Sequence, residues 1–245
     1  DDATRLGTYR SLLTGNAPSV ALMSETVRRL ARMLVSQLLD QVPRDALAKD
    51  ATVQHGLDLI WQHPQVRHEV VELLAVREGL VDHVHHDLLR HPFVPLKVHA
   101  RYTRLEVLAA FGHGDGAHVA PWQAGVFWVP EAKVDLFAFT LDKTVGSFSP
   151  TTRYRDYAIS RELIHWESQS ITRADSGTGQ RYQAHVERGS DVVLFARLRQ
   201  DDRAFWCLGP ATYVSHEGER PMAITWRLDY PLPGDLFTQF AAAVA

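Results

Sequence analysis

Hydrophobic residues recur at the spacing of α-helices through the first part of the chain. Val27, Leu30, Leu34 and Leu38 are separated by polar residues, which is typical of a helix with one apolar face. Three more stripes follow, at Val53, Leu57, Ile60 and Trp61, at Val66, Val70, Leu73 and Leu74 after Pro64, and at Leu80, Val81, Val84 and Leu88. None of these residues carries obvious chemistry, so the pattern predicts a small helical bundle over residues 1–92.

Two prolines interrupt this periodicity in residues 91–96. The residue before a proline disfavours the helical conformation, so this segment is predicted to be an extended connector. Thr103 and Glu106 then form a capping box, and Gly112 suits a helix end, which predicts one short helix. We therefore expect two domains, a helical one at residues 1–92 and a second one at residues 93–245.

The second domain is dominated by the patterns of β-strands. Residues 125–129 and 134–141 are rich in β-forming residues, and residues 191–198 and 204–214 flank a polar turn. Between residues 222 and 228 apolar and polar positions alternate, which indicates a half-buried strand. The predicted fold is α+β, with the helical bundle followed by an antiparallel β-barrel-like domain or a strongly curved sheet.

Composition narrows the class of protein. The chain has 245 residues, of which 45% are hydrophobic and 22% charged, as in globular proteins rather than disordered ones. Apolar runs are too short for a membrane helix, so no membrane partner is expected. The chain begins at Asp1 without a signal-peptide pattern, and we interpret it as part of a longer cytoplasmic protein. The net charge is −3, so any nucleic-acid binding must come from a local patch.

The common catalytic and metal-binding motifs are missing. The single cysteine, Cys207, excludes a disulfide framework and a cysteine-rich zinc site, and it is predicted to be a small buried residue. Four histidines between residues 83 and 91 lack a metal-ligand spacing. Neither a nucleophile elbow nor a phosphate-binding loop is present. Asp135 and the acidic residues near Lys143 resemble part of a metal nuclease site, but the Glu-x-Lys arrangement of such nucleases is missing. We expect no catalytic residue, metal or cofactor in this chain, and enzymatic activity stays open.

Residues 143–182 are the most informative stretch. Hydroxyl side chains, amides and arginines that can contact phosphates alternate there with aromatic residues that can stack on a base. The alternative is a long polar loop with core aromatics. The candidate nucleic-acid-binding residues are Arg104, Gln123, Lys143, Ser149, Thr151, Thr152, Arg153, Tyr154, Arg155, Asp156, Tyr157, His165, Trp166, Ser168, Gln169, Ser170, Thr172, Arg173 and Arg181.

Several segments carry a family resemblance. They are PLKVHARYTR at 95–104, continuing as LEVLAAFG, WQAGV at 122–126, FSPTTRYRDYA at 148–158, HWESQS at 165–170, LGP at 208–210 and RPM at 220–222. Over residues 95–235 the chain resembles the uncharacterised C-terminal domain of bacterial superfamily-two DEAD/DEAH-box helicases, which often carry a phospholipase-D-like nuclease. The resemblance implies that residues 1–92 join the motor to this domain, and that helicase and nuclease domains of the same polypeptide are partners.

The resemblance further implies a target-recognition module of a restriction or phage-defence protein that binds DNA, with modified duplex DNA as a candidate. Such a module would be similar in role to PUA-like readers, which flip a base into an aromatic pocket. Tyr154, Tyr157, Trp166 and Trp128 could form the cage. Alternatives are a docking domain between the motor and its nuclease or another subunit, and a nuclease domain. Whether Trp166 stacks on a base or packs in the core is left open, as are the modification and the strandedness of the DNA.

Overall fold

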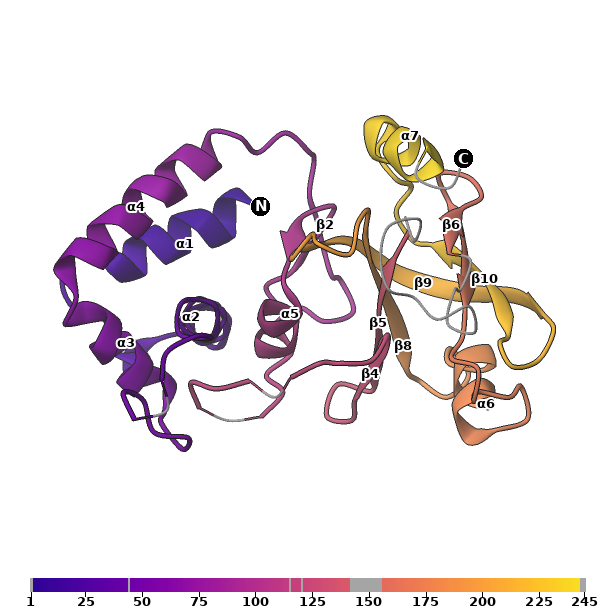
Figure 1. The fold of residues 1–245 in the computed structure, drawn as a ribbon, viewed down its shortest axis with the longest axis horizontal. Helices are drawn as coiled ribbons and strands as arrows, with labels where there is room; N and C mark the ends of the chain where they lie inside the picture. The colour runs from indigo at the N-terminus through magenta and orange to yellow at the C-terminus, as the bar shows by residue number, and fades with distance from the viewer. Residues whose placement is uncertain (1, 44, 115, 120, 142–155, 243–245) are drawn as a thin grey trace. The chain divides into compact units, whose positions relative to one another are not determined.

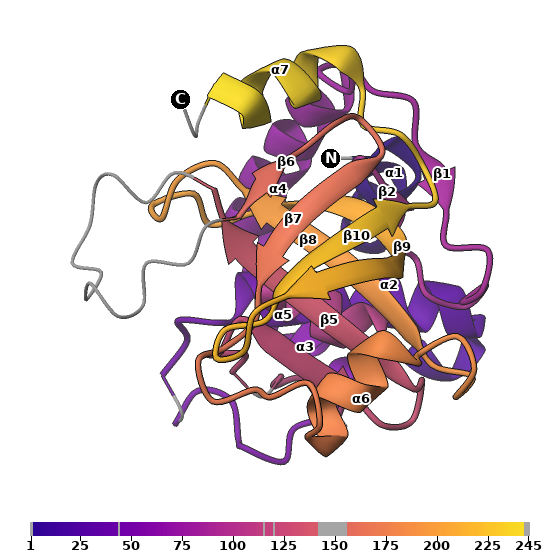
Figure 2. The ribbon, with the colours of Figure 1, turned by 90° about the vertical axis from the view of Figure 1, so that its right-hand side faces the viewer.

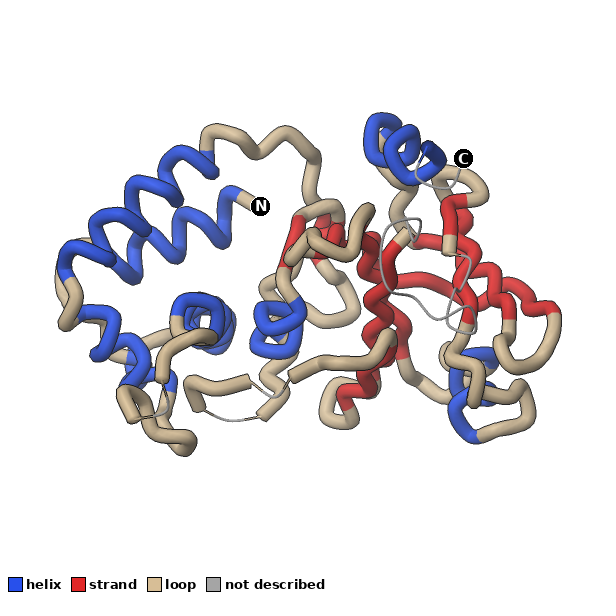
Figure 3. Tube along the Cα trace, viewed as in Figure 1, coloured by secondary structure: helices blue, strands red, loops and turns tan. Residues whose placement is uncertain are grey.

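The computed structural model describes residues 2–43, 45–114, 116–119, 121–141 and 156–242. The chain divides into two compact units, Asp1–Trp122 and Gln123–Ala245, which are described separately. Helices are the main regular elements of the first unit and strands are those of the second (Figure 3). The first unit extends beyond the boundary expected at residue 92, because the helix that follows the connector packs against an earlier helix. The boundary at residues 92 and 93 stays a prediction for proteolysis.

Five α-helices form the described first unit (Figure 1): α1 Ala3–Leu13, α2 Glu25–Leu38, α3 Val53–Trp61, α4 Pro64–Glu78 and α5 Arg104–Ala110, with a short 3-10 helix at Val20–Leu22. Short strands β1 His86–Asp87, β2 Lys97–Val98 and β3 Arg101–Tyr102 accompany them. The capping box at Thr103 and Glu106 is confirmed, and Pro64 occupies the first turn of α4.

The fourth predicted stripe of the helical bundle is wrong. Residues 80–88 are not helical, because α4 ends at Glu78, with Gly79 as its C-cap, and the chain continues to β1. Leu80 and Val84 are exposed, whereas Leu88 is buried. Spacing alone could not distinguish a helix face from apolar residues of a loop.

A buried ionic network ties α1 to the segment around α5. The guanidinium of Arg5 donates to the Glu106 carboxylate at 3.0 Å and lies 4.2 Å from the centre of the Tyr102 ring. Asp2 accepts hydrogen bonds from the backbone N–H of Arg5 and from the Tyr102 hydroxyl. Because buried charges are costly unless they are paired, this network fixes how α1 sits on its neighbours.

The second unit contains strands β4 Val126–Val129, β5 Val134–Thr140, β6 Tyr157–Ala158, β7 Leu163–Glu167, β8 Asp191–Arg197, β9 Phe205–Glu217 and β10 Ala223–Leu228, with α6 Gly177–Gln183 and α7 Gly234–Ala242. Their order in the sheet is β4-β5-β8-β9-β10-β7-β6, and Figure 2 shows β6, β7, β10 and β9 next to one another. The expected antiparallel arrangement is wrong for one pair, since β5 and β8 are parallel. The long connection between them, which includes α6, supplies the crossover that parallel strands require.

Strand β9 makes the sheet curve. Its first half pairs with β8 and its second half with β10, and the register shifts in both pairs. The core lies within the curve and includes Phe137, Trp166, Trp226 and, from α7, Phe240. The α+β class is confirmed. The described strands do not close into a barrel, because β4 and β6 lie at the two opposite edges of the sheet and do not pair with each other.

Among the residues that the structure describes, none of the helices combines the length and the apolar character needed to span a bilayer.

Candidate nucleic-acid interface

Part of the predicted site cannot be placed. Lys143, Ser149, Thr151, Thr152, Arg153, Tyr154 and Arg155 lie outside the described residues. The remaining candidates lie on or beside strands β6 and β7 and on the loop and helix that follow β7, except for Arg104 on helix α5 of the first unit and Gln123 at the start of the second.

The strand β7 separates the candidates by face. Alternation along β7 predicted that Trp166 and His165 point to opposite faces, and the burial pattern confirms it. Trp166 is 3% exposed, and its ring centre lies 4.3 Å from that of Phe137. Ser168 is also buried and accepts a hydrogen bond from the backbone N–H of Met222. The structure therefore places Trp166 in the core, as one of the two interpretations of this residue expected.

Two further candidates support the backbone. Asp156 is buried, and its carboxylate accepts a hydrogen bond of 3.0 Å from the N–H of Glu167. Thr172 is buried in the turn after β7, where its N–H donates to the carbonyl of Gln169. These contacts hold the end of β7 and its loop in place.

The opposite face of these strands carries a continuous row of side chains. Tyr157 on β6 faces His165 on β7, His165 faces Thr225 on β10, and Thr225 faces Ser215 on β9. We call these four residues the polar row. Ser215 is exposed and the other three are half-buried, and the strands that carry them lie side by side in Figure 2.

An aromatic stack begins the polar row. The rings of Tyr157 and His165 lie 4.6 Å apart, centre to centre, with an angle of only 13° between their planes. The sequence-based assignment included both residues but missed Thr225 and Ser215. The alternation in residues 222–228 held the signal for Thr225, whereas the pairing of four distant strands is visible only in the fold.

The charges on this face are arranged asymmetrically. Arg227 is exposed and lies two residues beyond Thr225 on β10, on the same face. Glu167 and Glu217, which both face Ala223 across their strand pairs, lie beyond the row in the other direction. The polar row therefore lies between a basic side, at Arg227, and an acidic side, at Glu167 and Glu217.

Arg181 has partners inside the protein. Its guanidinium donates two hydrogen bonds, of 2.6 and 2.9 Å, to the carboxylate of Asp135, which is fully buried on β5. It also lies 4.4 Å from the ring centre of Trp128 on β4. Burial raises the pKa of Asp135 while Arg181 opposes that rise, and the hydrogen bonds to Asp135 raise the pKa of Arg181. This clamp anchors α6 to the sheet.

The other polar candidates are spread over loops. Arg173 and Ser170 are exposed on the segment that follows β7, and Arg173 forms an ion pair with Asp175. Gln169 is half-buried in the same segment. Arg104 belongs to the first unit, where it donates to the carbonyl of Trp122, and Gln123 is an exposed residue at the start of the second unit.

Two expectations about chemistry can be compared with the structure. Cys207 is fully buried, and burial raises the pKa of its thiol to about 12, so the prediction of a small buried residue is confirmed. In the part of the chain that the structure describes, no three His, Cys, Asp or Glu side chains gather as a metal ion would require.

Comparisons with known proteins place the chain in a family. The family model described as "Domain of unknown function (DUF3427)" matches residues 96–240, which is more than half of the chain. No curated protein matches this chain.

Two solved structures of one protein show a distant likeness. A crystal structure of Arabidopsis thaliana SUVH6 in complex with SAM, form 2, has a TM-score of 0.41 and 14% identity, and the match covers 98% of this chain and 41% of that one. Form 1 has a TM-score of 0.37 and 12% identity, covering 95% and 40%. The chain thus corresponds to less than half of SUVH6, and a likeness at these scores supports neither a common fold nor a common function.

Proposed function

This chain belongs to the DUF3427 family, and we propose that its β-rich unit is a DNA-binding target-recognition module. The resemblance of residues 95–235 to the C-terminal domain of DEAD/DEAH-box helicases gives the setting, a helicase-containing restriction or phage-defence protein. The polar row is the observation that carries the proposal.

The polar row combines the two kinds of group that bind nucleic acid without a deep pocket. The stacked rings of Tyr157 and His165 are half-buried, so an unstacked base can stack against them. Hydroxyls of Thr225 and Ser215 continue the row and can donate to phosphate oxygens. Trp166 and Ser168 support the row from behind.

The charge asymmetry gives the bound strand a direction. Phosphates are attracted to Arg227 and repelled by Glu167 and Glu217, so the backbone is expected to pass along the basic side of the row. The base would then reach the aromatic end. A modified base flipped out of a duplex is the ligand we favour, because flipping supplies the single unstacked base that such a platform receives.

The test measures DNA binding of the full chain by fluorescence anisotropy, with modified and unmodified duplexes and a single strand. Tyr157→Ala should weaken binding by about 1–3 kcal/mol, roughly 5- to 150-fold in Kd, because it removes the outer ring of the stack. Tyr157→Phe keeps the ring and should bind like the original protein. Equal affinity of Tyr157→Ala and the original protein would remove the polar row from the interface.

Salt dependence tests the basic side of the polar row separately. Arg227→Ala should weaken binding to every sequence alike and reduce the slope of log K against log salt by about one unit. Arg188→Ala, an exposed arginine beyond α6, is the matched control and should change neither. If both variants keep the original slope, Arg227 contacts no phosphate.

A second candidate function is docking to the helicase motor or a partner subunit, and helix α4 favours it. Val66, Leu73 and Val76 on α4 are more than half exposed, and no residue of this helix is buried. Helices that expose apolar residues on one face commonly pack against a partner. Leu73→Glu should abolish co-purification with the motor domains and leave DNA binding intact if docking is the function. Cleavage of DNA by the chain with Mg²⁺ would instead support the nuclease alternative.

A further inference from the structure

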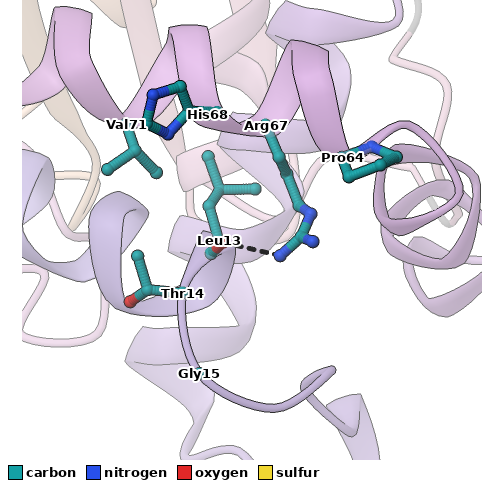
Figure 4. Close-up of a pocket in the computed structure, with 7 residues that line it drawn as sticks. All are labelled: Leu13, Thr14, Gly15, Pro64, Arg67, His68 and Val71. Atoms are coloured by element: carbon teal, nitrogen blue, oxygen red, sulfur yellow. Dashed lines mark hydrogen bonds between the residues drawn. The ribbon is translucent and has the colours of Figure 1, made fainter.

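A pocket in the first unit is formed by the packing of two helices. Figure 4 shows Arg67 of α4 in its wall, where Nη1 donates a hydrogen bond of 3.0 Å to the carbonyl of Leu13 at the end of α1. This hydrogen bond joins the two helices. The polar row lies in the other unit, where the sheet itself carries further side chains beside the row.

A second row of side chains runs parallel to the polar row on the same face of the sheet. Leu163 on β7 pairs with Arg227 on β10, and Arg227 pairs with Thr212 on β9. The carbonyl of Leu163 accepts a hydrogen bond of 2.8 Å from the N–H of Ile159, which lies two residues beyond Tyr157. Each member lies next to the polar row at the two-residue spacing that places side chains on one face. We call Ile159, Leu163, Arg227 and Thr212 the second row.

The second row is apolar at one end and cationic further along. Ile159 is 45% exposed and Leu163 is half-buried, whereas Arg227 is exposed. Residues two apart on a strand are about 7 Å apart and neighbouring strands about 5 Å apart, so the backbone of Ile159 lies about 7 Å from that of Tyr157 and about 10 Å from that of Arg227. The apolar end therefore adjoins the aromatic stack, and the cation adjoins the hydroxyls of the polar row.

The turn that carries Ile159 is fixed by hydrogen bonds. The hydroxyl of Ser160 accepts a hydrogen bond of 3.1 Å from the N–H of Leu163. Arg161 is tied to Leu232 twice, since its Nε donates to the carbonyl of Leu232 at 2.7 Å and its own carbonyl accepts from the N–H of Leu232 at 2.8 Å. Because the turn is already ordered, little conformational entropy is lost when a ligand contacts Ile159.

Base flipping leaves an empty space in the duplex. The neighbouring base pairs lose their stacking there, and proteins that open base steps commonly insert an apolar side chain between them. The phosphate backbone is expected to pass along Arg227, so the duplex lies on the basic side of the polar row. The turn with Ile159 is on that same side. Ile159 is thus an apolar, exposed and rigidly held side chain between the duplex and the aromatic stack.

We propose that Ile159 enters the space that the flipped base leaves, so that the ligand of the second unit is duplex DNA with one extrahelical base rather than a single strand. This inference rests on the proposed DNA-binding function. In the complex the flipped base stacks against Tyr157 and His165, Arg227 contacts the phosphate backbone, and Ile159 packs against the base pairs that the flipped base has left.

The test compares two DNA probes in anisotropy titrations of the full chain. A duplex with a single abasic site offers the gap without a base, and a single strand offers bases without a gap. Ile159→Ala should raise Kd for the abasic duplex about tenfold and leave Kd for the single strand unchanged, because it removes the apolar contact that fills the gap. Tyr157→Ala should show the opposite preference and weaken the single strand more than the abasic duplex.

Two further variants serve as controls. Ile159→Leu keeps an apolar side chain of the same size and should bind the abasic duplex like the original protein. Ile171→Ala makes the same truncation at a residue that is 81% exposed on the loop after β7, and should change neither Kd. Equal Kd of Ile159→Ala and the original protein for the abasic duplex would overturn the proposal, as would equal losses with both probes. If the original protein binds neither probe, the DNA-binding function itself fails and this proposal fails with it.

Discussion

At the scale of single residues, the buried charge of Arg5 gives the clearest expectation. Arg5→Ala should destabilise the first unit by about 3–5 kcal/mol, because the carboxylates of Asp2 and Glu106 would stay buried without their partner. Urea unfolding measures the change. Arg28→Ala removes an exposed arginine that pairs with Glu25, and should cost less than about 1 kcal/mol. Equal losses in the two variants would mean that burial of the network contributes nothing.

Replacement of Trp166 distinguishes a role in folding from a role in DNA recognition. As a core residue packed on Phe137, its replacement in Trp166→Ala should cost roughly 3–5 kcal/mol of unfolding free energy. The fraction that remains folded should still bind DNA with the original affinity, which titration calorimetry corrected for the folded fraction can measure. A stable variant with lost binding would restore the stacking interpretation.

His99 makes the first unit sensitive to acid. Burial lowers its pKa from 6.5 to about 4, so the folded state holds the ring neutral while the unfolded chain accepts a proton. The stability that depends on the neutral ring is complete above pH 6.5 and should be lost progressively as the pH falls to about 4. His99→Asn, which tolerates the positive φ of 70° at this position, should flatten that decline. Melting temperatures across this pH interval give the comparison.

At the scale of elements, α6 depends on one close approach. A Cβ atom on Gly179 would lie 2.0 Å from the carbonyl oxygen of Arg173, whereas one on Gly177 would meet open space. Gly179→Ala should therefore destabilise the second unit by about 1–3 kcal/mol. Gly177→Ala in the same helix should be neutral or stabilising by up to about 1 kcal/mol. Thermal unfolding of the two variants provides the test. Equal losses of stability would show that α6 shifts to make room for the added methyl group.

Local signals in the sequence predicted most of the elements and only some of their partners. Caps and prolines located the starts of α4 and α5, and the period of two showed that Trp166 and His165 face opposite ways on β7. The parallel pairing of β5 with β8 was missed, because strand order depends on contacts between distant segments. For the same reason the sequence supplied Tyr157 and His165 of the polar row but not Thr225 and Ser215. The hydrogen bonds between Arg181 and Asp135 could not be predicted either, since the two residues lie far apart in the sequence.

At the scale of the whole molecule, limited proteolysis tests where the chain divides. Residues 89, 90, 92 and 93 are exposed, so a protease should cut near residue 93 and produce a fragment that contains the family-matched residues 96–240. The two pieces should stay together until denaturant is added, because α5 packs on α2. Cleavage within Val134–Thr140 would contradict this division.

The shared strand β9 also determines how the second unit comes apart. The first half of β9 is hydrogen-bonded to β8 and its second half to β10. The two sides of the sheet therefore depend on the same strand for their backbone hydrogen bonds. Opening one side exposes the middle of a strand whose other half is still paired, and the two sides cannot exchange their amide protons with solvent independently. Hydrogen–deuterium exchange should then reveal a single, slowest class of amides that spans both sides of the curve.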